Sequence, residues 1–239
     1  MEQAEYALMD AVEQSMWWYR ALHARLLDML APLDGGRILD AGCGTGGFLR
    51  LLRSRRPNLQ TVGLEWNENA ARRAIAKSNS LVVMGSVNET PFRSASFDAI
   101  VSADVLCHEA VQPQQALAEF LRLLRPRGLL VVNMPAHEWL RSAHDRRVRT
   151  ARRVTARSFS IMLSQAGFEQ VRGRYWNSLL LPVMAMRRKV LSRSIHACSD
   201  VSHFPRWQNT TLYAVSALER SLKVNMPAGG SVLVTAVRP

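Results

Sequence analysis

Short apolar runs alternate with longer amphipathic stretches along most of the chain. The apolar runs predict seven strands, near residues 38–39, 60–65, 81–84, 96–102, 129–134, 168–175 and 231–237. Apolar positions at helical spacing predict helices over residues 4–31, 46–55, 67–77, 114–124, 155–166 and 207–222. Such alternation is typical of an α/β protein. The 239 residues are enough for one domain of this class with additions.

A glycine-rich segment connects the first predicted strand to the helix that follows it. The strand residues Ile38 and Leu39 are followed within three positions by the first of four closely spaced glycines. Phe48, Leu49 and Leu52 then continue at helical spacing. Because glycine has no Cβ and tolerates a positive φ, such a turn lets a ligand approach the backbone closely.

Two classes of cofactor fit this turn. The dinucleotide pattern G-x-G-x-x-G is met by Gly42, Gly44 and Gly47. A different pattern, acid-x-Gly-x-Gly-x-Gly, is met by Asp40, Gly42, Gly44 and Gly46. A carboxylate at this position repels a pyrophosphate and attracts the cationic sulfonium of S-adenosylmethionine (SAM). Asp40 therefore favours SAM, and a glycine turn without a ligand is the remaining alternative.

Two motifs resemble the class I SAM-dependent methyltransferases. Residues 39–46 resemble the first motif of that family, and Leu124-Arg-Pro-Arg-Gly128 resembles the turn before its fifth strand. With the segments between them, the resemblance covers residues 37–134. It implies SAM as cofactor and a Rossmann-like seven-stranded sheet whose strand seven is antiparallel. It also implies that the methionine part of SAM is held by Asp40, Gly42, Cys43, Gly44 and Gly46.

The second and third strands end in further candidates for cofactor binding. Glu65 ends the second strand, 19 residues after Gly46, where a carboxylate can accept from both ribose hydroxyls. Trp66 follows, and its ring is a candidate for packing on the adenine. The resembling family usually has an aspartate where this chain has Ser86, so we expect Ser86 and the backbone near Val87 to share the adenine contact.

The loop after the fourth strand supplies the candidates for catalysis. In open α/β sheets ligands bind beyond the carboxyl ends of the strands, which predicts that the loop from Ala103 to His108 lies beside the methyl donor. His108 matches a histidine of the resembling family, and His144 precedes Asp145. Either histidine is a candidate general base for an acceptor that must lose a proton. A purely structural contact is the alternative for each.

Other polar and aromatic residues are candidates for the acceptor side. Residues 133–157 resemble some small-molecule, lipid- or sugar-directed members of the family, which implies substrate contacts from His137, Arg152 and Arg153. Tyr19 lies in the aromatic group of the first helix and is a candidate for a lid over SAM, with packing on the sheet as the alternative.

We expect one methyltransferase domain over residues 1–239, divided by role. Residues 1–34 are expected to form an N-terminal helical lid and residues 37–175 the core. Residues 176–228 form a long insertion before the last strand at 229–239, and insertions of this length usually shape a binding site. An apolar stretch beside basic residues within the insertion fits a membrane surface or an acyl chain, and helix packing is the alternative.

Charge and composition bear on the partners. The net charge of +12 is concentrated in arginines at 141–157 and 187–193, which favours an anionic or lipid-linked acceptor or a solvated surface. Cys43, Cys107 and Cys198 are too widely spaced to suggest a disulfide framework or a zinc site, so no metal is predicted. The acidic N-terminus does not resemble a signal peptide, and no apolar run is long enough to span a membrane. A cytoplasmic protein is therefore expected.

These observations predict a methyltransferase acting on an O or N atom of a small molecule. An RNA methyltransferase is the alternative that the charge suggests, but Ser102-Ala-Asp104 stands where an Asn-Pro-Pro-Tyr-like segment would be needed. Nucleic acid is therefore disfavoured as a partner. A non-catalytic SAM-binding subunit is the alternative from a different class.

Overall fold

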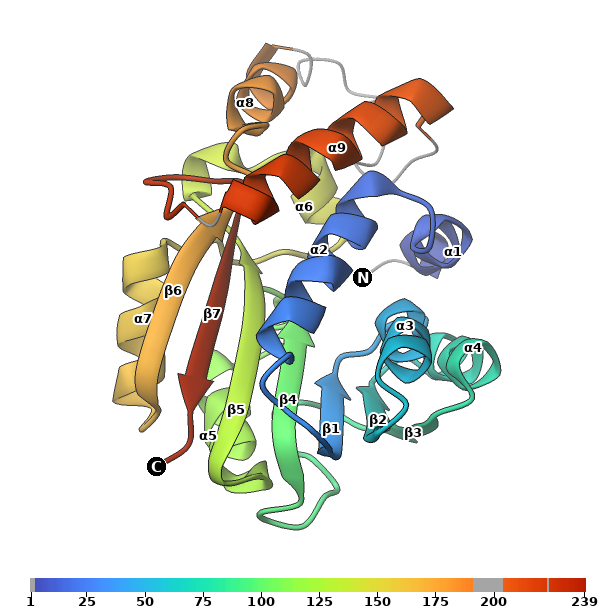
Figure 1. Ribbon diagram of the computed structural model, residues 1–239, viewed down its shortest axis with the longest axis vertical. Coiled ribbons are helices and arrows are strands. Elements are labelled where there is room, and N and C mark those ends of the chain that lie inside the picture. Colours follow the sequence, from blue (N-terminus) through green and yellow to red (C-terminus); the bar gives the residue numbers. More distant parts are fainter. Residues whose placement is uncertain (1–2, 191–203, 223) are drawn as a thin grey trace.

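A seven-stranded sheet forms the centre of the computed structural model, which describes residues 3–190, 204–222 and 224–239 (Figure 1). The strands are β1 (Gly36–Ala41), β2 (Leu59–Glu65), β3 (Leu81–Met84), β4 (Phe97–Ala103), β5 (Leu124–Pro135), β6 (Glu169–Trp176) and β7 (Ser231–Val237). Their order across the sheet is β3-β2-β1-β4-β5-β7-β6. β7 runs antiparallel to both β5 and β6, while the pairs from β3 to β5 are parallel. The predicted Rossmann-like sheet with an antiparallel seventh strand is confirmed.

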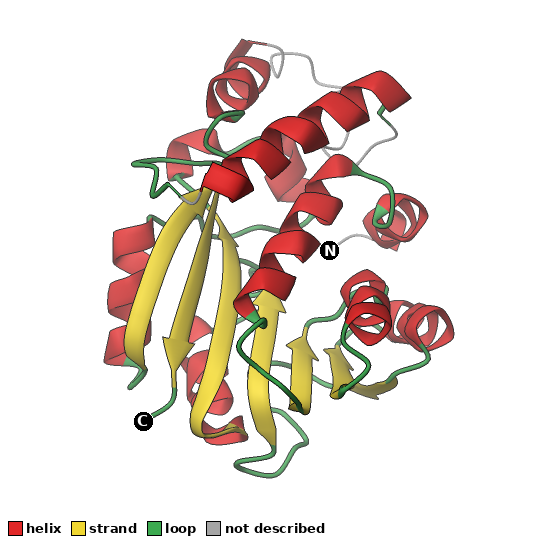
Figure 2. Cartoon of the chain, in the orientation of Figure 1, coloured by secondary structure: helices red, strands yellow, loops and turns green. Residues whose placement is uncertain are grey.

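Helices cover both faces of this sheet (Figure 2). The central ones are α3 (Gly47–Arg55), α4 (Glu68–Ser78), α5 (Pro113–Leu123) and α7 (Ala156–Gln165). On one face Phe120 and Phe159 of α5 and α7 are fully buried against the sheet. On the other face Leu22 and Leu26 pack with Ile38 of β1. The strands between the two edges are thus largely buried from both sides, as their apolar runs require, while the edge strands β3 and β6 are mostly exposed or half-buried.

The single N-terminal helix predicted over residues 4–31 is wrong. The structure has α1 (Gln3–Val12) and α2 (Trp17–Met29) with a break between them. A distant residue caps the second helix, because the side-chain oxygen of Asn209 accepts from the backbone N–H of Trp17 at 2.6 Å. The amide of Asn209 also donates to the carbonyl of Ser15 at 2.8 Å. Local periodicity carries no sign of such a cap.

The described part of the insertion contains the helices α8 (Leu181–Val190) and α9 (Arg206–Leu222). α9 confirms the helix predicted over residues 207–222 and packs along α2. Its Glu219 accepts from three consecutive backbone N–H groups, those of Asn177, Ser178 and Leu179, at 2.7–2.9 Å. Glu219 also pairs with the buried Arg25 of α2 at 3.3 Å. One carboxylate therefore fixes the insertion to the end of β6 and to the N-terminal helices.

Several smaller predictions are also tested by the structure. The helix predicted over residues 67–77 is confirmed as α4, and Asn67 caps it by accepting from the N–H of Ala70 at 3.0 Å. The side chains of the basic segment at 187–193 and of Cys198 are not among those that the structure describes. Among the described residues, no helix combines the length and the apolar character needed to cross a membrane.

Candidate cofactor and acceptor site

The glycine turn holds a backbone conformation that a larger residue could not adopt without strain. Gly42 has a φ of +90°, and a Cβ there would lie 2.2 Å from Val105. Gly46 has a φ of +86°, and a Cβ there would lie 2.7 Å from the backbone of Ala74 in α4. Both glycines are needed because the turn approaches neighbouring segments closely. The backbone N–H groups of Gly42 and Cys43 donate to the carbonyl of Leu64, which fixes the turn to β2.

Two acidic side chains lie next to this turn at the ends of adjacent strands. Asp40 is 3% exposed and Glu65 is 5% exposed. Burial, together with the nearby charges of Glu65 and Glu13, raises the pKa of Asp40 to about 8. No described basic side chain offsets this effect on Asp40. A buried carboxylate without a cation is unfavourable, so the chemistry of this site fits a cationic ligand such as SAM.

Glu65 is already engaged within the protein. One carboxylate oxygen accepts from the backbone N–H of Gly44 at 2.8 Å. The other accepts from the N–H of Asn67 at 3.0 Å and from the hydroxyl of Tyr6 at 3.2 Å. Burial and the charge of Glu65 raise the pKa of Tyr6 above its ordinary value. The carboxylate expected to hold the ribose is therefore oriented by the turn and covered by α1.

Helix α1 lies over the glycine turn and beside α4 (Figure 1). Glu13, just after α1, accepts from the hydroxyl of Thr45 at 2.8 Å and from the N–H of Gly47 at 3.2 Å. Lys77 of α4 pairs with both Asp10 and Glu13. Burial raises the pKa of Glu13. Sequence reasoning missed Tyr6 and Glu13, because their contacts join residues more than 30 positions apart.

The other residues predicted to bind the cofactor lie around the same strand ends. Cys43 and Val87 are buried, and the Ser86 hydroxyl accepts from the N–H of Asn88 at 3.1 Å. Trp66 is 74% exposed, so its ring is open to solvent next to Glu65. Ala103 ends β4. Their contacts with the cofactor remain predictions.

A third acidic residue, Asp104, follows β4 directly. Its φ is +55°, a left-handed conformation uncommon for a residue other than glycine. Its carboxylate accepts from the side-chain amide of Asn133 at 2.9 Å. Asn133 is fully buried on β5 and in turn accepts from the indole N–H of Trp176 at 2.8 Å. Burial raises the pKa of Asp104 to about 7. Asp104 belongs to the loop predicted to lie beside the methyl donor, whereas Asn133 and Trp176 were not predicted to contribute to the site.

Two aromatic residues of α2 lie near these groups. Tyr19 and Trp18 have ring centroids 5.1 Å apart in an edge-to-face arrangement, and Trp18 lies 5.9 Å from Trp176. The pKa of Tyr19 is raised by burial and by the charges of Glu13, Asp104 and Glu5. Tyr19 therefore lies within electrostatic reach of Glu13, beside the glycine turn, and of Asp104, and its role as a lid remains a prediction. We call Asp40, Glu65 and the turn at 42–46 the cofactor side, and Tyr19, Asp104, Asn133 and Trp176 the acceptor side.

His108 and Arg152 stabilise the loop after β4. One guanidinium nitrogen of Arg152 donates to the carbonyls of Leu106, His108 and Val111 at 2.8–2.9 Å. The His108 ring lies against the backbone of Val148 and Arg149, and burial lowers its pKa. These contacts support the structural alternative for both residues, and their roles in catalysis or substrate binding remain predictions.

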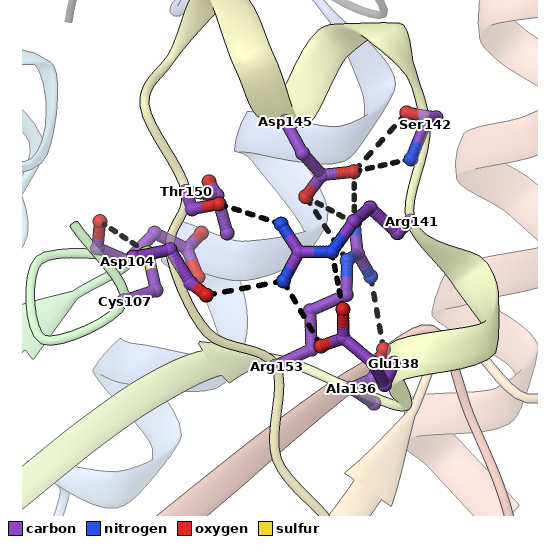
Figure 3. A network of polar contacts seen from close by, with 10 residues as sticks. Asp104, Cys107, Ala136, Glu138, Arg141, Ser142, Asp145, Thr150 and Arg153 are labelled. Atoms are coloured by element: carbon purple, nitrogen blue, oxygen red, sulfur yellow. Dashed lines mark hydrogen bonds and ion pairs between the residues drawn. The ribbon is translucent and has the colours of Figure 1, made fainter. Parts of the chain in front are cut away.

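Arg153 forms a buried ion pair with Asp145 (Figure 3). The two side chains are 3% and 2% exposed, and the closest nitrogen–oxygen distance is 2.8 Å. Arg153 also donates to the carbonyl of Ala136 at 2.9 Å. His144 lies half-buried on α6 (Ala143–Arg147), while its neighbour Asp145 turns inward to the ion pair. Asp145 is therefore engaged by Arg153 and Ser142, and a role of His144 as a base remains a prediction.

His137 follows β5 with a φ of +51°. Its ring stacks on Tyr175 at 5.0 Å and on Trp139 at 5.8 Å between centroids. Burial and the charge of Arg153 lower its pKa. Its buried Nε2 has no hydrogen-bond partner among the described residues. Its contact with an acceptor remains a prediction.

Internal contacts occupy much of the arginine run at 141–157. Arg141 pairs with Glu138 and donates to the carbonyls of Thr150 and Ala151, and Arg149 pairs with Glu109 at 3.2 Å. With the contacts of Arg152 and Arg153, these bonds give the run a structural role. The anionic acceptor inferred from it gains no support from the structure.

Comparisons with known proteins agree with the geometry of the site. Residues 39–132 match the family described as "Methyltransferase domain". A 24-methylenesterol C-methyltransferase 2 of Oryza sativa is 34% identical over 51% of this chain and 34% of its own length. A malonyl-[acyl-carrier protein] O-methyltransferase of Herminiimonas arsenicoxydans is 33% identical over 45% of this chain and 40% of its own length. The chain thus spans well under half the length of these curated relatives.

Solved structures share the fold across almost the whole chain. A Thermotoga maritima SAM-dependent methyltransferase, described as a possible histamine N-methyltransferase, has a TM-score of 0.60 and 19% identity, covering 99% of this chain and 96% of that one. A Haemonchus contortus phosphoethanolamine N-methyltransferase 2 in complex with SAM has a TM-score of 0.64 and 17% identity, covering 91% of this chain and 52% of that one. Residues 39–132 therefore match a methyltransferase domain family, and the described chain shares its strand order and fold with SAM-dependent methyltransferases of known structure.

Proposed function

We propose that this chain binds SAM and transfers its methyl group to an O or N atom of a small-molecule acceptor. The observation that carries the proposal is the pair of buried carboxylates, Asp40 and Glu65, on both sides of the glycine turn. Asp40 has no cation among the described residues to offset its charge. A ligand that carries a sulfonium and an ammonium group supplies what this site lacks.

Each part of the cofactor has candidate partners in the chain. Asp40 and the turn at 42–46 hold the methionine part. Glu65 accepts from the ribose hydroxyls once the Tyr6 hydroxyl leaves the Glu65 oxygen to which it donates. The adenine edge lies near Ser86 and Val87. When bound, SAM supplies an electrophilic methyl group, and the protein positions the acceptor in line with it. His108 and His144 act as bases only for an acceptor that arrives protonated.

The covering helices favour a small acceptor over a large one. α1, α2 and α9 lie over the carboxyl ends of the central strands (Figure 2). A lipid-linked acceptor fits this arrangement if its tail leaves across the exposed apolar side chains of α8 and α9. Val183, Met186 and Trp207 are such side chains and are 52–69% exposed. Peripheral contact with a membrane and a cytoplasmic location belong to the same proposal.

Calorimetric titration with SAM, with S-adenosylhomocysteine and with NAD tests the cofactor. We expect both sulfur compounds to bind and NAD not to bind. Formation of S-adenosylhomocysteine in the presence of panels of small hydroxyl and amine compounds then tests for turnover, and NMR of the product identifies the methylated atom. Binding of NAD in place of SAM would refute the proposal. Binding of SAM without turnover on any acceptor would favour a non-catalytic subunit.

A further inference from the structure

Asp104 has a position and a backbone conformation that are unusual for a loop carboxylate. It is the first residue after β4, next to Ala103, at the edge of the sheet where the methyl donor is expected. Its backbone is left-handed, with a φ of +55°. Such a conformation in a non-glycine residue costs about 1 kcal/mol or more and is concentrated at functional sites. The strain indicates that the direction of this side chain matters.

A chain of two buried residues fixes the Asp104 carboxylate. The indole N–H of Trp176 donates to the side-chain oxygen of Asn133, which determines the orientation of the Asn133 amide. The Asn133 amide nitrogen is then forced to face Asp104, to which it donates at 2.9 Å. The backbone N–H of Asp104 also donates to the carbonyl of Asn133 at 2.9 Å. Asn133 is fully buried and Trp176 is 2% exposed, so this support is rigid.

The charges around Asp104 leave one negative charge uncompensated. Asp145 of α6 and Arg153 of the segment after α6 both act on Asp104. These two side chains pair with each other at 2.8 Å, so their charges balance. Cys107 lies in the same loop, and burial and the charge of Asp104 raise the pKa of its thiol. Tyr19 faces the carboxylate from α2. Figure 3 shows Asp104, Cys107, Asp145 and Arg153 within one polar network.

We propose that Asp104 binds the nucleophilic nitrogen of the acceptor and accepts a proton from it, so that the acceptor is a primary or secondary amine. A protonated amine supplies the positive charge that Asp104 lacks and donates to its carboxylate. Tyr19, whose pKa is raised by the charge of Asp104, and its neighbour Trp18 add aromatic rings near the carboxylate, which also favour a cation. An anionic acceptor would be repelled. This inference rests on the proposed function and names its substrate class.

The ammonium of the acceptor transfers one proton to the Asp104 carboxylate, which leaves a neutral amine with a lone pair. The nitrogen forms a bond to the methyl carbon of the cofactor, and the carbon–sulfur bond breaks with its electron pair passing to sulfur. The products are the methylated ammonium and neutral thioether sulfur. Asp104 then releases its proton to solvent. Asn133 and Trp176 are positioning residues in this step.

Three probes of similar shape and different charge test the inference. Benzylamine, benzyl alcohol and benzoate are titrated into the protein saturated with S-adenosylhomocysteine, and binding is followed by ligand-observed NMR. We expect benzylamine to bind at least tenfold more tightly than benzoate and also more tightly than the alcohol. In Asp104→Asn this preference should disappear while the affinity for S-adenosylhomocysteine changes less than twofold. Equal binding of the three probes by the wild-type protein would overturn the proposal.

A matched control and a pH series separate Asp104 from general charge effects. Glu109→Gln removes an exposed carboxylate five residues away in the same loop, and it should keep the preference for benzylamine. In the wild-type protein, binding of benzylamine should weaken as the pH falls below about 7, because Asp104 then becomes protonated and neutral. This series needs no variant, so it decides the question even if Asp104→Asn does not fold. A flat profile between pH 6 and about 8 would contradict the role of Asp104.

The same samples distinguish this inference from the proposed function. If neither SAM nor S-adenosylhomocysteine binds, the proposed function fails. If both bind and benzylamine is not preferred, or if Asp104→Asn retains the preference, only the assignment of Asp104 and of an amine acceptor fails.

Discussion

The cofactor side and the acceptor side of this site depend on contacts of very different range. On the cofactor side, Asp40 and the glycine turn occupy seven consecutive positions, and Glu65 lies on the adjacent strand. On the acceptor side, Tyr19, Asp104, Asn133 and Trp176 come from four separate elements. Arg153 joins Asp145 to the carbonyl of Ala136 just after β5, and Glu219 of the insertion accepts from the N–H of Asn177 next to Trp176. The cofactor side is therefore built mostly from a local motif, whereas the acceptor side is built from long-range contacts.

The largest expected effect tests the long-range support of the acceptor side. Asp145→Asn leaves the Arg153 guanidinium buried without its anion, and breaking a buried pair in this way typically costs about 3–5 kcal/mol. We expect the free energy of unfolding in urea to fall by about that amount. In protein that remains folded, affinity for SAM should stay nearly unchanged, because the cofactor side does not depend on this pair.

Glu138→Gln is the matched control for this change. Glu138 pairs with Arg141 in the same region, but its side chain is 62% exposed, so its loss should cost under about 1 kcal/mol. Equal losses of stability in the two variants would show that the Asp145–Arg153 pair does not hold the acceptor side.

The next largest effect is expected on the cofactor side. Glu65→Gln removes the charge that accepts from Gly44, Asn67 and the ribose, and hydrogen bonds to a charged group contribute about 1.5–3 kcal/mol each. We expect affinity for SAM, measured by calorimetry, to fall about 30- to 100-fold. Glu68→Gln removes an exposed carboxylate three positions later and should leave the affinity unchanged. A similar loss in both variants would point to general charge and not to recognition of the ribose.

The contrast between the two sides also explains which features the sequence could predict. The seven strands, the glycine turn and Glu65 follow from local periodicity and from spacing within one β-α-β unit. Asp104 lies within the loop predicted to lie beside the methyl donor but was not distinguished from its neighbours, because its contact with Asn133 joins residues 29 positions apart. Arg152 and Arg153 were predicted to contact substrate from the family resemblance, and the sequence does not reveal their internal partners. The break between α1 and α2 depends on Asn209, 192 positions from Trp17.

The pH dependence of stability should distinguish Asp40 from ordinary surface carboxylates. Its folded pKa, about 8, lies above the ordinary carboxyl value, so the native state binds more protons than the unfolded state between those values. Stability without cofactor is therefore full at acidic pH and falls as the pH rises through about 8. Asp40→Asn should remove this loss and raise the free energy of unfolding at pH 8 by about 1–3 kcal/mol. Urea denaturation of both proteins at several pH values measures this difference in the free energy of unfolding.

Saturating SAM provides the control for Asp40. In the wild-type protein it should reduce the loss of stability at high pH, because the cationic cofactor favours the charged carboxylate. In Asp40→Asn it should stabilise much less. Equal stabilisation of both proteins by SAM would show that Asp40 does not face the cofactor.

The smallest expected effect concerns the cover that α1 places over the cofactor side. The Tyr6 hydroxyl donates to Glu65 at 3.2 Å and so competes with the ribose for the same oxygen. Tyr6→Phe removes this competitor, and we expect affinity for SAM to rise by up to about threefold, which corresponds to about 0.6 kcal/mol. Tyr213→Phe in α9, where the ring lies against Arg20, should not change it. A fall in affinity on Tyr6→Phe would instead make Tyr6 a ligand of the bound cofactor. The local motif would then need a contribution from α1, and the cofactor side would also depend on long-range contacts.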